Sequence, residues 1–181
     1  MGYEVSIEKA WEELSDREGK VSVGFLNDEY EVDFESKEVL SLSCNIPAKD
    51  YYKILILHYL AKEENVLSIE QDDWASFKEM EGGGAYYTAF RKRAIEPILR
   101  KYGDDPLAIY ERMKDLNASK LDIGTAGLSI KVFEKIRVGV VLWAKDEEFS
   151  AECNMFFNRS IKCILPTEDI AVLGGIVVSK I

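Results

Sequence analysis

The sequence contains few of the residues that most often carry chemistry. Its 181 residues include one histidine and three cysteines, Cys44, Cys153 and Cys163. The cysteines lie too far apart for the C-x₂-C-x₂-C series of an iron–sulfur site. A zinc-binding H-E-x-x-H motif, a P-loop, a G-x-G-x-x-G turn and a G-x-S-x-G elbow are also absent. The sequence therefore has no complete catalytic or cofactor-binding motif, and we expect neither a metal nor a cofactor.

Basic residues are scarce relative to acidic ones. The 23 lysines and arginines stand against 33 aspartates and glutamates, which gives a net charge of −10. Such a charge repels phosphate backbones and anionic lipid, so we expect no nucleic-acid partner and no membrane association. No apolar run approaches the roughly 18 residues that span a bilayer. The acidic, amphipathic N-terminus does not resemble a signal peptide, and the odd cysteine count favours a reducing compartment, so we predict a cytoplasmic protein.

Apolar residues, in contrast, are plentiful. They make up 47% of the chain, and aromatic residues make up 11%, enough for the packed core of one domain over residues 1–181. Residues 48–62 are apolar on almost every side, which predicts a buried central helix. Alternating apolar and polar residues predict β meanders over 21–42 and 128–157. Further helices are expected over 6–17, from the glycines at 82–84 to 96, over 105–116 and from 167 onward. We therefore predict an α+β fold, with two antiparallel β meanders packed around the central helix and additional flanking helices.

The only histidine, His58, lies within the predicted central helix. An imidazole can act as an acid, a base or a ligand. A histidine between Leu57 and Tyr59 is, however, more often a core residue that is hydrogen-bonded to a carbonyl or carboxylate. An acid/base pair of His58 with Glu79 or Asp146 is the alternative. Asp146 also belongs to an acidic loop that lacks the spacing of a calcium site and that we interpret as a charged hairpin tip.

Three consecutive glycines, Gly82, Gly83 and Gly84, directly precede a predicted helix. Free N–H groups at a helix start bind anions, and glycine lets a ligand approach the backbone. Residues 91–101 then contain five basic residues and one acidic residue, a local charge of +4. The alternative is a tight turn followed by a solvated helix face. The candidate ligand-binding residues are Trp74, Gly82, Gly83, Gly84, Tyr87, Arg91 and Arg93.

Four segments together resemble a known family. They are LHYL at 57–60, WASFKEMEGGGAYYTAFRKRA at 74–94, LWAKDEEF at 142–149 and ILPTED at 164–169. In this order and spacing they are similar to the uncharacterised bacterial and archaeal family catalogued as domain of unknown function 3786. The resemblance implies an anaerobic host. It also implies, by association only, an iron–sulfur or corrinoid protein of one-carbon metabolism as partner, because some members carry a small iron–sulfur module that this chain lacks.

Three functions remain open from the sequence. The leading one is a binding or accessory module in anaerobic metabolism, which holds a small anionic ligand or a protein partner on the surface around 82–93. The second is a small-molecule enzyme that uses His58 with an acidic residue. The third is a purely structural subunit, which a large exposed apolar patch would favour.

Overall fold

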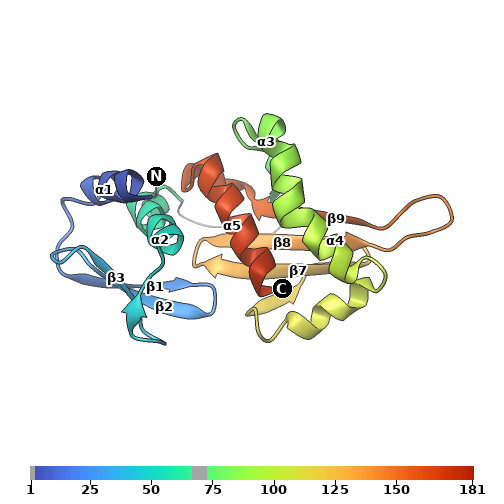
Figure 1. The fold of residues 1–181 in the computed structure, drawn as a ribbon, viewed down its shortest axis with the longest axis horizontal. Helices are drawn as coiled ribbons and strands as arrows, with labels where there is room; N and C mark the ends of the chain where they lie inside the picture. The colour runs from blue at the N-terminus through green and yellow to red at the C-terminus, as the bar shows by residue number, and fades with distance from the viewer. Residues whose placement is uncertain (1–2, 67–72) are drawn as a thin grey trace.

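The computed structural model describes residues 3–66 and 73–181. It contains two antiparallel sheets with helices packed against both, as predicted (Figure 1). The first sheet is a meander with strand order β1-β2-β3-β4. Its strands are β1 (Lys20–Phe25), β2 (Asp28–Asp33), β3 (Glu38–Ser41) and the short β4 (Ile46–Pro47). Val23, Tyr30 and Val32 face the core, while Glu29 and Glu31 face away from it, which is the period of two expected for a half-buried sheet.

The second sheet is larger, with strand order β5-β9-β8-β7-β6. Its centre is a second meander of β7 (Ala126–Phe133), β8 (Ile136–Trp143) and β9 (Glu152–Asn158). The two edge strands, β5 (Trp74–Ser76) and β6 (Ala118–Lys120), were not predicted. Each is only three residues long, too short to show an alternating pattern in the sequence.

The central helix is α2 (Asp50–Lys62), which contacts both sheets. The Tyr52 ring lies 5.0 Å from Phe25 of β1, and the Tyr59 ring stacks on Phe133 of β7 at 4.2 Å. Figure 1 shows α2 between α1 (Glu4–Glu12) and α5 (Thr167–Lys180). The buried residues of both sheets and of α2 form one hydrophobic cluster, so α2 is the buried element on which both meanders pack.

The helices after the glycines differ from the prediction. α3 (Gly83–Phe90) continues through a π-helical turn (Arg91–Ile95) into α4 (Glu96–Tyr102). Pro97 does not end the helix, because it lies in the first turn of α4, where its missing N–H costs least. The helix predicted over 105–116 is a 3₁₀ helix, Pro106–Arg112. No helix within residues 3–66 and 73–181 has the length and apolar character needed to cross a bilayer.

Candidate functional site

The surface around the glycines begins with a short capped turn. A 3₁₀ turn, Phe77–Glu79, follows β5 and is closed by a capping box, in which Glu79 accepts a 2.7 Å hydrogen bond from the Ser76 N–H. The turn buries Phe77, which stacks on Phe90 of α3 with ring centroids 4.0 Å apart. Gly82 then takes a left-handed φ of +69° to start α3. At the other end of α3, the Phe90 ring lies 6.2 Å from the Phe157 ring of β9, so this end of the helix packs on the second sheet.

The basic residues after α3 do not converge on one place. Arg91 and Arg93 are two positions apart in a helical segment, and residues at that spacing point to opposite sides. Arg91 lines one cavity, and Arg93 lines another. The local charge of +4 in the sequence is therefore divided between surfaces.

The Arg91 pocket lies between the middle of the helical segment and the start of β9, with a volume of about 300 Å³. Lys78, Tyr87 and Arg91 line it from the helical side, and Glu152 and Asn154 line it from β9. The Lys78 ammonium lies 4.2 Å from the centre of the Tyr87 ring, so the aromatic face positions that cation. Arg91 is held only loosely, since its Nε lies 3.8 Å from Glu96, beyond hydrogen-bond distance. The described residues that line the pocket therefore include two cations and one carboxylate.

The Arg93 pocket lies between α3 and the start of α5 and is larger, about 560 Å³. Gly82, Tyr86 and Arg93 line it together with Glu81 and Glu168. Arg93 donates a 3.1 Å hydrogen bond to the Tyr86 hydroxyl. Its described lining has one cation against two carboxylates, so this pocket is less suited to an anion than the Arg91 pocket.

Three of the seven predicted ligand-binding residues line neither pocket. Gly83 is buried, and a Cβ there would lie 2.0 Å from the Phe77 carbonyl oxygen, so this glycine serves close packing. Gly84 is exposed and has open space around it. Trp74 belongs to β5 and packs over Gly139 of β8, with its indole Nε1 buried and unpaired within the described part of the chain. Two other residues of the Arg91 pocket, Lys78 and Asn154, could not be selected from the sequence. Asn154 lies opposite α3 only because β9 pairs with β8 and β5.

His58 is paired with a carboxylate that the sequence did not indicate. Its Nδ1 lies 2.5 Å from Oδ2 of Asp169 in the first turn of α5. An ionised carboxylate can only accept, so Nδ1–H donates. The two side chains are 17% and 10% exposed, which makes the pair a nearly buried link between α2 and α5. His58 lines neither the Arg91 pocket nor the Arg93 pocket.

The two carboxylates proposed for an acid/base pair have other partners. Glu79 bonds to Ser76 and to Arg159 at 3.1 Å, and these contacts lower the pKa of the Glu79 carboxyl. Asp146 accepts hydrogen bonds from the N–H groups of Phe149 and Glu148 at 2.7 and 2.9 Å, which lower its pKa. Both carboxylates therefore organise turns.

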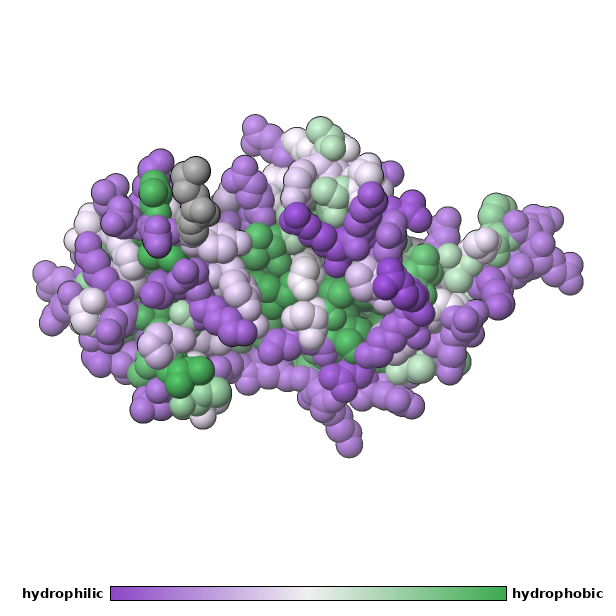
Figure 2. All heavy atoms as spheres, viewed as in Figure 1, coloured by the Kyte–Doolittle hydropathy of each residue, from purple (hydrophilic) through white to green (hydrophobic). Residues whose placement is uncertain are grey.

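Asp146 shapes the loop between β8 and β9, which projects from the right of Figure 1. Figure 2 shows the tip of this projection as mostly hydrophilic with a small hydrophobic spot, and Phe149 in this loop is 66% exposed.

Among the residues that the structure describes, no group of three or more histidine, cysteine, aspartate or glutamate side chains is arranged to hold a metal ion.

The three cysteines should differ sharply in reactivity. Cys44 and Cys163 are exposed, whereas burial raises the pKa of the Cys153 thiol to about 12. Since the thiolate is the nucleophile, iodoacetamide at pH 8 should alkylate Cys153 at least about 100-fold more slowly than the other two. Peptide mass spectrometry over a time course measures this. Comparable labelling of Cys153 would show that the edge of β9 opens in solution.

Comparison with known proteins identifies the family. The chain matches the model of a domain of unknown function, DUF3786, over residues 7–180. The protein therefore belongs to this family, and the resemblance seen in the sequence is confirmed. No curated protein and no solved structure matches the chain.

Proposed function

We propose that this member of the DUF3786 family is a binding module for a small anionic molecule, which it holds in the Arg91 pocket. The observation that carries the proposal is the presence of two cations, Lys78 and Arg91, on one cavity of about 300 Å³ in a chain of net charge −10. A guanidinium offers a flat pair of donors that matches a carboxylate or a phosphate. The ammonium of Lys78 adds a point charge, and the amide of Asn154 adds a neutral hydrogen-bonding group.

The lining of the pocket supports binding rather than chemistry. Cys153 also lines it, but at a pKa of about 12 its thiol stays protonated and is a poor nucleophile at neutral pH. Glu152 is exposed on β9, and the histidine lies elsewhere. Among the described residues that line the pocket, no nucleophile therefore has an adjacent base. As part of the same proposal, the module serves a protein of anaerobic metabolism, a setting that rests on the family resemblance alone.

The test is a binding measurement on matched arginine variants. Isothermal titration with inorganic phosphate, pyrophosphate, citrate, nucleotides and corrinoids should find at least one ligand. Arg91→Ala and Lys78→Ala should each weaken its binding at least about tenfold, since each removes one cation from the pocket. Arg93→Ala removes the same charge from the opposite side and should leave the affinity within about twofold.

Two results would overturn the proposal. One is that no probe at millimolar concentration produces binding heat in the titration or raises the melting temperature of the protein. The other is an equal loss of affinity in the Arg91 and Arg93 variants, which would show that general surface charge attracts the anion rather than this pocket.

A further inference from the structure

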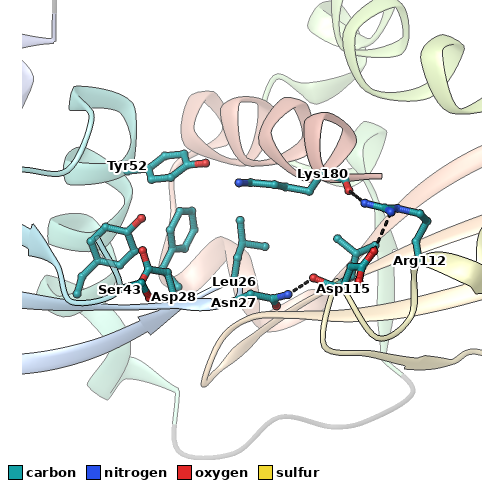
Figure 3. Close-up of a pocket in the computed structure, with 11 residues that line it drawn as sticks. Leu26, Asn27, Asp28, Ser43, Tyr52, Arg112, Asp115 and Lys180 are labelled. Atoms are coloured by element: carbon teal, nitrogen blue, oxygen red, sulfur yellow. Dashed lines mark hydrogen bonds and ion pairs between the residues drawn. The ribbon is translucent and has the colours of Figure 1, made fainter. Parts of the chain in front are cut away.

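A third cavity, the Lys180 pocket, lies between the first sheet and the end of α5, away from the Arg91 pocket. Its volume is about 300 Å³, within the range of small-molecule sites. Phe25, Leu26 and Leu116 form apolar parts of its lining. Figure 3 shows polar groups from two parts of the chain around the cavity, with Asp28, Ser43 and Tyr52 on one side and Lys180, Arg112 and Asp115 toward the other.

The acidic side is built around the Asp28 carboxylate at the start of β2. Its Oδ1 accepts hydrogen bonds from the Glu29 N–H and from the Ser43 hydroxyl, and its Oδ2 accepts one from the Ser41 hydroxyl at 2.6 Å. Partial burial by itself would raise the pKa of Asp28, but the bonds from Ser41 and Ser43 outweigh burial and lower it. Asp28 is therefore an oriented anion without a cationic partner in the described part of the chain.

Tyrosine hydroxyls extend the same side of the pocket. Burial, followed by the charge of Asp28, raises the pKa of Tyr30, so its hydroxyl stays protonated. Tyr52 of α2 lies beside it, with ring centroids 6.3 Å apart. Both line the cavity, so this wall presents hydroxyl groups next to the carboxylate.

Among the residues that the structure describes, the basic side of the pocket has a paired cation, Arg112, and a cation without an ion pair, Lys180. Arg112 donates to Asp115 at 2.8 Å and to the Lys180 backbone carbonyl at 3.0 Å, so it fixes the end of α5. Its Nε is buried without a partner among the residues that the structure describes. The Lys180 ammonium forms no ion pair within that part of the chain, and Figure 3 shows its side chain extending across the pocket toward Tyr52. Within residues 3–66 and 73–181, an ammonium and a carboxylate that both lack an ion-pair partner thus line one cavity.

We propose that the Lys180 pocket binds a small zwitterion, a free amino acid with an apolar side chain. The ammonium group of the ligand would pair with Asp28, its carboxylate would pair with Lys180, and its side chain would contact Phe25, Leu26 and Leu116. Pairing of opposite charges on ligand and protein fixes the orientation of the ligand, and the apolar lining selects the side chain. This inference is independent of the anion proposed for the Arg91 pocket, since the two cavities share no lining residue.

The test uses one amino acid and two analogues that each lack one of its charges. Titration of ¹⁵N-labelled protein with L-leucine should shift the amide signals of Asn27, Asp28 and Ser43. 4-Methylpentanoate lacks the amine, and 3-methylbutylamine lacks the carboxylate. Each should bind at least about tenfold more weakly than leucine, because each leaves one charge of the pocket unpaired.

Lys180→Met separates loss of binding from loss of folding, because Lys180 is exposed and its side chain holds no other residue in the described chain. This variant should keep the wild-type spectrum outside the pocket and lose at least about tenfold in affinity for leucine. Asp28→Asn should do the same, whereas Arg91→Ala should bind leucine normally. The titrations use leucine, methionine and phenylalanine at about 10 mM, which is enough to detect a dissociation constant in the millimolar range. The proposal fails if none of the three shifts an amide signal near Asp28. It also fails if either analogue binds as well as leucine, or if Lys180→Met binds leucine unchanged.

Discussion

Replacing Asp169 with alanine should lower the free energy of unfolding by about 2–4 kcal/mol. The change leaves the His58 imidazole in a nearly buried position without the carboxylate that lies 2.5 Å from its Nδ1. Breaking one side of a buried pair is costly because the remaining polar group loses both its partner and its access to water. For a chain of this length, the expected fall in melting temperature is about 5–15 °C. Urea unfolding at pH 7, followed by circular dichroism, measures the free energy.

The neighbouring residue provides a matched control. Glu168 has the same charge in the same turn of α5 but is exposed, so Glu168→Ala should cost less than about 1 kcal/mol. A double-mutant cycle of His58→Leu and Asp169→Leu should give a coupling energy of about 1–3 kcal/mol. Equal effects of the Asp169 and Glu168 variants, with no coupling to His58, would mean that the carboxylate acts only on the helix dipole.

The position of His58 could be predicted from the sequence, but its partner could not. Its apolar neighbours in residues 48–62 indicated a buried helix, and the preference of a core imidazole for a carbonyl or carboxylate followed from burial alone. Asp169 lies 111 positions away along the chain. In the sequence, Asp169 is an acidic residue in the first turn of a predicted helix, where a carboxylate interacts favourably with the helix dipole. That interaction needs no tertiary contact. Only the packing of α2 against α5 brings the two side chains together.

The candidate site shows the same limit. The glycines at 82–84 indicated the start of a helix, and α3 begins at Gly83. The cavities on its two sides were not predicted. Residues two positions apart in a helix point to different sides, so the sequence already implied that Arg91 and Arg93 point apart. The summed charge of +4 over residues 91–101 does not show this separation. Lys78 and Asn154 meet at the Arg91 pocket through a short edge strand that has no recognisable pattern. The Lys180 pocket is a still clearer case, since Asp28 and Lys180 occupy opposite ends of the chain.

Gly83→Ala should destabilise the protein by about 2–3 kcal/mol, although alanine normally favours a helix over glycine. The added Cβ would lie 2.0 Å from the Phe77 carbonyl oxygen and 3.3 Å from the Met80 Cβ. The first contact is with backbone, so no side-chain rotation relieves it, and the 3₁₀ turn that holds Phe77 must move away from α3. That movement also disturbs the stacking of Phe77 on Phe90, and overpacking of this kind typically costs 1–3 kcal/mol, about what we expect here. Urea unfolding measures the loss.

Gly84→Ala, one residue later, should change stability in the opposite direction. A Cβ at Gly84 meets nothing within 4 Å, and an exposed helical alanine is favoured over glycine by about 0.5–1 kcal/mol. Gly82→Ala should fall between the two, because its φ of +69° strains an alanine by about 1 kcal/mol although the space is open. A stabilised Gly83→Ala variant would show that the turn at Phe77 yields easily. The predicted order instead makes the middle glycine a packing requirement.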